Sequence, residues 1–547
     1  MTVSAGRTVA EAVGETLAAL GVAHAYGVVG SGNFAVTNAL RAAGVGFTAA
    51  RHEGGAATMA DAHARTSGAV AVLSVHQGCG LTNAMTGIGE AAKSRTPLVV
   101  LAADVAGSAV RSNFRVDQDA LVRAVGAVPE RIHTAHSAVA DTVRAFRVAR
   151  QQRRTVVLNL PLDVQAQECS TTVPTTAIEP WGPTRPDTAS VASLAALLDG
   201  AGRPVFVAGR GARDAGPELV ALAASCGALL ATSAVVHGLF TGEEWSLGIC
   251  GGFATPRVAT LVAEADLVVA WGASLTMWTT RHGALIGDDA TVVQVDDDPA
   301  ALGANGPIDL GVHGDVGEVA RDVAAAVTGS LPGYRTVEVG KRLAAEGRWG
   351  TPADDTSGPG GIDPRVLSAR LDALLPQERT VAVDSGNFMG YPAAYLAVPD
   401  AAGFCFTQGF QSVGLGLSTA IGAAIARPDR LTVAALGDGG FLMGISELET
   451  AARLGLGLLV VVYDDAAYGA EVHHFGGADH TTVTFPDRDL AAVGRGFGCD
   501  GLVVRSVEDL DGITSWLDGP RDRPLVVDAK VVSDEPAWWL AEAFRGH

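Results

Sequence analysis

Short, uninterrupted runs of apolar and β-branched residues alternate along this chain with Ala- and Leu-rich stretches. Continuous apolar runs are typical of strands buried on both faces, and their alternation with helices predicts parallel sheets covered on both sides. This feature limits the fold class to α/β. The runs that we expect to form strands cover residues 69–75, 97–102, 155–160, 204–208, 267–270, 291–295, 380–383, 432–436, 458–463 and 524–528.

Two stretches rich in proline or glycine interrupt this alternation and predict linkers. Residues 171–190 contain four prolines, and the stretch of roughly residues 328–363 ends in a Gly- and Pro-rich segment. A chain of 547 residues, 48% of them hydrophobic, is longer than a single core usually supports. We therefore expect three doubly wound parallel-sheet domains, covering residues 1–170, 190–330 and 360–547.

Charge and cysteine usage argue against several classes of function. The 39 Lys and Arg residues are outnumbered by 59 Asp and Glu residues, and the net charge of -20 repels nucleic acid and anionic membranes. The six cysteines are scattered without a CxxC pair, as is typical of thiols in a reducing compartment. Neither a secretory signal pattern nor an apolar run of about 18 residues is visible. We expect a cytoplasmic protein without nucleic-acid or membrane partners.

The most specific motif lies in the third expected domain. Gly437-Asp438-Gly439-Gly440 ends one predicted strand, and Asp465 follows the next strand. Because the carboxyl ends of neighbouring parallel strands form a ligand crevice, we expect Asp438 and Asp465 to lie together. Two carboxylates suit Mg²⁺, and glycines let backbone N–H groups approach phosphate oxygens closely. An ordinary turn and a helix cap are the alternative explanation for either motif alone.

This part of the chain resembles the thiamine diphosphate signature of the acetolactate synthase, benzoylformate decarboxylase and pyruvate decarboxylase superfamily, which runs from GDG through a helix to two asparagines. The resemblance implies that Asp438 and Asp465 bind the metal through their side chains and Ala467 through its backbone carbonyl. Tyr468 is then expected at the cofactor. The chain departs from the signature because Asp464-Asp465 replaces Asn-Asn, and the extra carboxylate adds repulsion beside a polyanionic cofactor.

Two further segments of the third domain are expected to contact the cofactor. Ser385, Gly386 and Asn387 follow another predicted strand and could donate hydrogen bonds to it. Val413 stands where members of this superfamily carry the apolar side chain that bends the cofactor. A valine of an ordinary core would look the same, so this assignment depends on the resemblance.

Glu53 is the candidate for cofactor activation in the first domain. It begins a small-residue stretch just after a strand-like segment, so an acidic helix cap is the simpler explanation. The segment resembles the one that holds the cofactor-activating glutamate of the superfamily. The resemblance implies that Glu53 hydrogen-bonds a ring nitrogen of the aminopyrimidine and shares a proton with it.

Other candidates for proton transfer align with catalytic positions in the same superfamily. Ser31 and His76 match a serine and a histidine of benzoylformate decarboxylase, and Glu471 matches a glutamate of pyruvate decarboxylases. A histidine side chain titrates near neutrality and is therefore suited to this chemistry. His473 and His474 are weaker candidates, because an isolated histidine or glutamate is more often an ordinary surface residue.

The middle domain contains the glycine-rich segment AGRGARDAG after a predicted strand, which taken alone suggests a nucleotide-binding loop. The resemblance implies instead the central domain of the superfamily, which binds FAD in biosynthetic acetolactate synthases. The FAD-binding segment of those enzymes is replaced here by residues around Trp278 and Arg281. FAD therefore stays an open alternative that the sequence does not favour.

Together these features predict a transferase or lyase that uses thiamine diphosphate and Mg²⁺ to act on a 2-oxo acid. The overall pattern favours decarboxylation followed by carboligation, as in acetolactate synthase. His76 and Glu471 favour the alternative of a 2-oxo acid decarboxylase that releases an aldehyde. A catalytically silent homologue and a nicotinamide dehydrogenase are further alternatives. The resemblance also implies a homodimer or homotetramer with active sites between subunits, so that Glu53 of one copy faces Asp438 of another.

Overall fold

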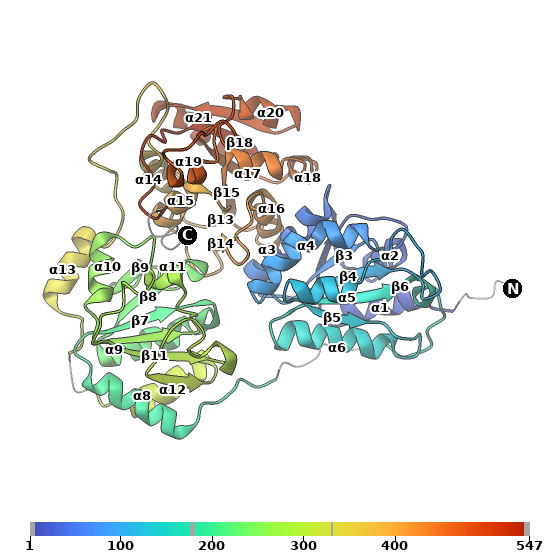
Figure 1. Ribbon diagram of the computed structural model, residues 1–547, viewed down its shortest axis with the longest axis horizontal. Helices are drawn as coiled ribbons and strands as arrows, with labels where there is room; N and C mark the ends of the chain where they lie inside the picture. Colours follow the sequence, from blue (N-terminus) through green and yellow to red (C-terminus); the bar gives the residue numbers. More distant parts are fainter. Residues whose placement is uncertain (1–5, 175–180, 330–331, 541–547) are drawn as a thin grey trace.

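The computed structural model describes residues 6–174, 181–329 and 332–540, which form three α/β units, each built on a parallel six-stranded sheet (Figure 1). The first sheet has the strand order β2-β1-β3-β4-β6-β5. Its strands are β1 (His24–Gly27), β2 (Gly46–Ala49), β3 (Ala71–Val75), β4 (Leu98–Asp104), β5 (Val128–Arg131) and β6 (Thr155–Pro161). Its helices are α1 (Val9–Ala19), α2 (Phe34–Ala42), α3 (Glu53–Ser67), α4 (Cys79–Lys93), α5 (Gln118–Ala124), α6 (Ala138–Gln151) and α7 (Leu162–Gln165).

The second unit, drawn in green in Figure 1, has the strand order β12-β11-β10-β7-β8-β9. Its strands are β7 (Pro204–Ala208), β8 (Leu229–Thr232), β9 (Ser246–Ile249), β10 (Leu267–Trp271), β11 (Thr291–Asp296) and β12 (Leu310–His313). Its helices are α8 (Thr188–Gly200), α9 (Gly216–Cys226), α10 (Pro256–Ala263), α11 (Met277–Thr280), α12 (Val316–Ala326) and α13 (Val337–Glu346).

The third unit has the strand order β14-β13-β15-β16-β18-β17, which repeats the order of the first unit when strands are counted within each unit. Its strands are β13 (Arg379–Val383), β14 (Phe404–Phe406), β15 (Leu431–Gly437), β16 (Leu458–Asp464), β17 (Asp500–Val504) and β18 (Leu525–Lys530). Its helices are α14 (Pro364–Leu374), α15 (Gly390–Tyr395), α16 (Gly416–Ala426), α17 (Asp438–Met443), α18 (Glu447–Arg453), α19 (Gly469–His474), α20 (Leu490–Gly496) and α21 (Asp511–Leu517).

The predicted α/β class is confirmed, and each of the ten predicted runs coincides with a strand. The strands that the apolar pattern missed are β1, β2, β5, β8, β9, β12, β14 and β17. All of these lie at an edge of a sheet or next to an edge strand. They have three to five residues each, too few to produce a long apolar run.

The two expected linkers differ from one another. Residues 171–174 and 181–187 of the first contain neither helix nor strand, its last three residues, 188–190, begin helix α8, and residues 175–180 lie outside the described residues. The second expected linker contains helix α13, whose Val339 and Leu343 are buried with the core of the central unit. Its short apolar face was not recognised as a helix in the sequence, because the surrounding residues are rich in Gly, Pro and charged side chains.

The first and third units pack together through α3 and α16, which lie side by side. Both helices consist largely of small residues, so their backbones approach closely. A Cβ atom at Gly422 of α16 would lie 2.1 Å from the carbonyl oxygen of Met59 in α3, so only glycine fits there. Hydrogen bonds also join the two units. The carboxylate of Glu90 in α4 accepts them from the backbone N–H groups of Gly409 and Phe410 in the third unit, at 3.0 and 2.6 Å.

The described helices include none with both the length and the apolar character that a membrane span requires.

Candidate active site

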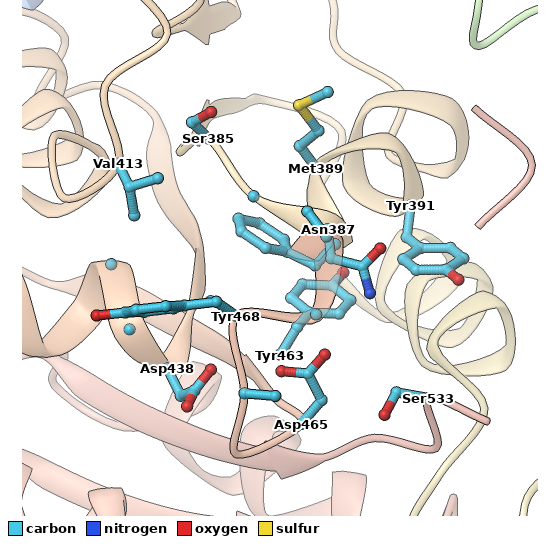
Figure 2. A pocket seen from close by; sticks show the side chains of 18 of the residues that line it. Ser385, Asn387, Met389, Tyr391, Val413, Asp438, Tyr463, Asp465, Tyr468 and Ser533 are labelled. Atoms are coloured by element: carbon cyan, nitrogen blue, oxygen red, sulfur yellow. The ribbon is translucent and has the colours of Figure 1, made fainter. Parts of the chain in front are cut away.

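A cavity of about 490 Å³ opens at the carboxyl ends of β13, β15 and β16 in the third unit (Figure 2). Asp438 is the first residue of α17, directly after β15, and Asp465 directly follows β16. Because β15 and β16 are paired in parallel register, their ends lie side by side. Figure 2 shows the two carboxylates directed toward the same space. The expected juxtaposition of Asp438 and Asp465 is thus present.

The charged forms of the two carboxylates are disfavoured by their surroundings, which raise the pKa values of both groups. Asp438 is only 7% exposed, and burial, followed by the charges of Asp465 and Asp464, raises its pKa to about 8. Burial likewise raises the pKa of Asp465 to about 6, although hydrogen bonds from Asn387 and Ala467 act in the opposite direction. A divalent cation between these oxygens would stabilise their charged forms and so oppose the burial that raises both pKa values.

Further oxygen atoms complete a set suited to a hard cation. Ala467 lines the same cavity, and the buried Oδ1 atom of Asn387 has no hydrogen-bond partner. No cluster of three or more His, Cys, Asp or Glu side chains suited to a metal occurs among the described residues. A site with two carboxylates, neutral oxygen atoms and ligand phosphates therefore fits this cavity better than an all-protein cage, and this is the ligand set that Mg²⁺ commonly takes.

The glycines of the GDGG motif form a cradle that a side chain would fill. A Cβ atom at Gly439 would lie 2.5 Å from the ring of Tyr468, and one at Gly440 would lie 2.4 Å from Oδ2 of Asp384. Gly437 also lines the cavity. A side chain does not fit at Gly439 or Gly440, and because both line the cavity, their backbone N–H groups could approach an anionic group such as a diphosphate closely.

Asp384, which the sequence analysis did not single out, organises the opposite wall. Its fully buried carboxylate accepts hydrogen bonds from the backbone N–H groups of Ser385, Gly414 and Leu415 at 2.8, 3.0 and 3.2 Å. Burial raises its pKa to about 6. Asp384 thereby fixes the loop that carries Val413. A buried acid of this kind has no distinctive sequence pattern, because its partners are backbone groups.

Some, but not all, of the other expected residues of the third unit line this cavity. Ser385, Gly386 and Val413 line it, as do Tyr468 and Glu471. Figure 2 shows the ring of Tyr468 between Val413 and Asp438. The weaker candidates His473 and His474 lie farther along α19 and are not among its lining residues.

A second cluster of expected residues lies in the first unit. Glu53 is the first residue of α3, and its Oε2 accepts a hydrogen bond from Nδ2 of Asn83 at 3.0 Å. A Cβ atom at Gly80 would lie 3.5 Å from Oε1 of Glu53 and 3.0 Å from the Cβ atom of His76. Glu53 and His76 therefore both lie next to Gly80. Asn83 is a partner that the sequence analysis missed.

His76 has a defined tautomer in this cluster. Its Nδ1 lies 3.0 Å from the carbonyl oxygen of Gln77, which can only accept a hydrogen bond, so Nδ1 carries the proton. Its Nε2 lies 3.4 Å from the hydroxyl oxygen of Ser31 and is then free to accept. The edge of the His76 ring packs against Phe114, with ring centroids 5.1 Å apart. Ser31 and His76 form a polar pair with a basic nitrogen.

A single chain does not unite the two clusters in one cavity. No described residue of the first unit lines the cavity that contains Asp438 and Asp465. The two units are nevertheless coupled, because Oε1 of Glu447 in α18 accepts hydrogen bonds from the backbone N–H groups of His52 and Arg51 at 2.9 and 3.1 Å. These two residues directly precede Glu53.

Comparison with known proteins finds three family models along the chain. They are described as the N-terminal TPP binding domain, the central domain and the C-terminal TPP binding domain of thiamine pyrophosphate enzymes. The N-terminal model matches residues 7–122, the central model 191–323 and the C-terminal model 384–529.

Curated relatives are similar over most of their length. A putative acetolactate synthase large subunit from Mycobacterium tuberculosis is 30% identical, with 85% of this chain and 87% of the relative covered. A sulfoacetaldehyde acetyltransferase from Rhodobacter capsulatus is 28% identical, with 92% and 90% covered. A probable 2-ketoarginine decarboxylase from Pseudomonas aeruginosa is 29% identical, again with 92% and 90% covered.

Proposed function

Because the chain belongs to the thiamine pyrophosphate enzyme family, we propose that it decarboxylates a 2-oxo acid and joins the remaining acyl unit to a second carbonyl compound, as an acetolactate synthase does. The observation that carries the proposal is the pair formed by the buried Asp438 and the partly buried Asp465 beside the glycines that line the same cavity. This arrangement suits a divalent cation with a diphosphate, and the family supplies the remainder of the coenzyme.

In this proposal, Asp438, Asp465 and the carbonyl of Ala467 hold Mg²⁺, and the backbone of Gly439 and Gly440, which line the same cavity, binds the diphosphate. The orphaned Oδ1 of Asn387 is an additional oxygen in the same cavity. Ser385, Gly386, Val413 and Tyr468 are proposed to contact the cofactor itself, since all four line the cavity. FAD is left out, because none of these features requires it.

Thiamine diphosphate, when bound, supplies a carbon nucleophile for the substrate carbonyl and an electron sink for the bond that breaks. Glu53 is proposed to share a proton with the cofactor's pyrimidine ring, and the hydrogen bond from Asn83 orients its carboxylate. The unprotonated Nε2 of His76, next to Ser31, is suited to accept or return a proton at the substrate. Glu471 lines the cavity and is proposed to do the same from the opposite side.

We further propose a homodimer as the smallest active form, in which Glu53 of one copy meets Asp438 of the other; two such dimers would form a tetramer. Two observations support the proposal. The two clusters do not share a cavity within one chain, and large apolar side chains are exposed near both of them. Phe34, three residues after Ser31, is 59% exposed. Met443, which lines the cavity that contains Asp438 and Asp465, is 57% exposed. A two-fold axis would cover both surfaces and create two equal sites.

A non-oxidative 2-oxo acid decarboxylase is the second candidate. The pair formed by Ser31 and His76 favours it, because an imidazole beside the substrate could take up a proton from solvent and deliver it to the carbon that remains after loss of carbon dioxide. One relative is named a probable decarboxylase, whereas others are named acetyltransferase or synthase. The two candidates share the cofactor and differ in the final acceptor.

Calorimetry followed by product analysis tests both parts of the proposal. The protein is titrated with thiamine diphosphate in the presence of Mg²⁺, with D438N as a variant expected to bind weakly. It is then incubated with a panel of 2-oxo acids, and products are identified by mass spectrometry. A carboligase yields a product that contains two substrate-derived units, whereas a decarboxylase yields an aldehyde one carbon shorter than the substrate. Absence of cofactor binding contradicts the proposal, and binding without turnover favours a silent homologue.

A further inference from the structure

Lys530, the last residue of β18, carries a buried ammonium group beside the strand end that leads to Asp465. Its side chain is 7% exposed, and it lies opposite Asp464 in the parallel pair of β16 and β18. Its Nζ donates to Oδ2 of Asp464 and, at 2.6 Å, to Oδ1 of Asp487. Oδ2 of Asp528 lies 3.1 Å away. This cation is therefore surrounded by acidic side chains close to the proposed metal site.

Asp464 is turned away from the cavity that Asp465 lines. Successive side chains of a strand point to opposite faces, and Asp464 is not among the residues that line the cavity. Its Oδ1 accepts a hydrogen bond from the backbone N–H of Ala466 at 2.9 Å. Ala466 has a φ of 54°, in the left-handed region that residues with a Cβ atom rarely adopt. The Asp464 carboxylate thus links Lys530 to the turn that presents Ala467.

The same ammonium also holds the segment that packs against this turn. Nζ of Lys530 donates to the carbonyl oxygen of Arg488. A few residues earlier, the carbonyl oxygen of Val483 accepts a hydrogen bond from the backbone N–H of Tyr468 at 2.8 Å. Lys530 therefore contacts the first residue of the loop formed by residues 464–468 and also the segment that hydrogen-bonds to its last residue.

The ion pair with Lys530 offsets part of the repulsion expected from an aspartate at position 464, whose charge still contributes to the raised pKa of Asp438. Burial alone would lower the pKa of the Lys530 ammonium, but its hydrogen bonds with Asp464, Asp487 and Asp528 raise it above its ordinary value. Lys530 therefore remains charged and can balance the negative charge of Asp464. A buried carboxylate with a fixed counter-charge disturbs a neighbouring anionic site much less than an uncompensated one.

We propose that Lys530 is a positioning residue for divalent-cation binding: it neutralises Asp464 and fixes the turn that brings Ala467 to the cation. Lys530 and Asp464 would then act as one unit, in the place where an uncharged asparagine is usual. The inference rests on the proposed function, because it takes Asp438, Asp465 and Ala467 as the metal ligands.

Binding of Mn²⁺, used as a spectroscopic substitute for Mg²⁺, tests the proposal without relying on activity. Free Mn²⁺ is measured by electron paramagnetic resonance with the full-length protein and thiamine diphosphate. The K530M variant is expected to bind Mn²⁺ about 10–100-fold more weakly, which is the usual effect of removing a residue that orients metal ligands. The D464N/K530M variant should return to within about threefold of wild type, because an asparagine can still accept the Ala466 hydrogen bond and no unpaired charge remains at position 464.

Arg430 provides a matched control in the same unit. Its side chain is also 7% exposed and is paired with Asp400, but it directly precedes β15, at the opposite end of the sheet from the cavity. The R430M variant is expected to lower the melting temperature while leaving Mn²⁺ affinity unchanged. A loss of Mn²⁺ affinity in R430M comparable to that in K530M would overturn the proposal, because the effect would then be one of general stability.

Other outcomes are equally decisive. Equal Mn²⁺ affinities of wild type and K530M overturn the proposal, whatever the melting temperatures. If K530M does not fold, D464N and D464N/K530M are compared, and the proposal requires the double variant to bind Mn²⁺ more tightly than D464N does. A wild-type protein that binds neither Mn²⁺ nor thiamine diphosphate would instead contradict the proposed function.

Discussion

Glu53 combines a fixed orientation with one oxygen that is free to act. Asn83 holds its Oε2, whereas Oε1 has no hydrogen-bond partner in the described part of the chain. Replacement by glutamine preserves the size of the side chain but removes the carboxyl group that could share a proton with the cofactor. We expect E53Q to lower kcat by about 10²–10⁴-fold, the usual contribution of a positioned acid or base.

Steady-state kinetics and calorimetry check this expectation together. Cofactor affinity of E53Q should change much less than kcat, because the proposed site for the diphosphate end of the cofactor lies in the third unit, away from Glu53. The control is E338Q in α13, where the side chain of Glu338 is 65% exposed. If the kcat of E53Q equals that of E338Q, Glu53 takes no part in the reaction.

His63, on the same helix as Glu53, makes the stability of the first unit sensitive to acid. It is 8% exposed and lies 2.8 Å from the hydroxyl of Tyr26. Burial, followed by the charge of His24, lowers its pKa from 6.5 to about 4. Between these values the unfolded chain binds the proton and the folded chain does not, so stability is lost as pH falls below about 6.5. The loss from this group should reach about 2 kcal/mol at pH 5.

Urea unfolding at pH 7.5 and pH 5 measures this contribution by comparing wild type with H63Q. Glutamine has no titrating group, so H63Q should lose less stability between the two pH values than wild type. The difference between the proteins isolates His63 from the many carboxylates that titrate in the same range. An identical loss in both proteins would show that His63 is not the sensitive group.

The sequence identified the residues with a recognisable chemical pattern but not their partners. Asp438 and Asp465 could be paired because each follows a long apolar strand. Asp464 was expected to add repulsion, because its counter-charge, Lys530, lies 66 residues away on another strand. Spacing in the sequence does not reveal such a pair, since the register of two parallel strands is set only by the folded sheet.

At the scale of elements, long central strands were predictable, and the strands that were missed are short and lie at or next to an edge of a sheet. β4, β6, β15 and β16 have seven residues each and are almost entirely buried, so each produces a continuous apolar run. β14 has only three residues, and although all of them are buried, so short a run is not distinctive. Helix α13 was missed for a similar reason, because its apolar face consists of only a few residues.

Glu447 at the start of α18 connects the third unit to the beginning of α3. It accepts two backbone hydrogen bonds, from Arg51 and His52, and is 2% exposed. The E447A variant would leave these donors unpaired, so we expect a loss of about 2 kcal/mol or more in the free energy of unfolding. Because Glu53 follows directly, kcat should fall as well.

Glu449, two residues farther along α18, provides the control for Glu447. It pairs with Arg51 and Arg453 at the surface, so E449A should cost no more than about 1 kcal/mol. Denaturant unfolding and steady-state kinetics of both variants give the comparison. Equal effects of E447A and E449A would mean that the buried hydrogen bonds do not position α3.

At the scale of the whole molecule, the separation of the two clusters predicts complementation between inactive variants. E53Q and D438N are each expected to be inactive. If each active site takes Glu53 from one copy and Asp438 from the other, a mixed dimer contains one intact site. An equal mixture with free exchange of subunits should therefore recover about a quarter of wild-type activity, because half of the dimers are mixed and each has one working site.

The mixture is prepared by co-expression with two different tags, and activity is measured on the doubly purified dimers. Such mixed dimers alone should show about half of wild-type activity. Inactivity of the mixed dimers would mean that both residues serve the same site from one chain, or that the subunits do not share sites. The single-variant preparations, handled in the same way, give the background.

The first and third sheets have the same strand order, and α3 and α16 occupy equivalent places, each after the second strand of its unit. These two helices also pack against each other. A protein made of one such unit could form the same helix–helix contact by pairing with a second copy of itself. The shared winding is therefore what an ancient gene doubling would leave behind. On that history, Glu53 of the first unit and the pair of Asp438 and Asp465 in the third unit are differences that two once-identical units acquired separately.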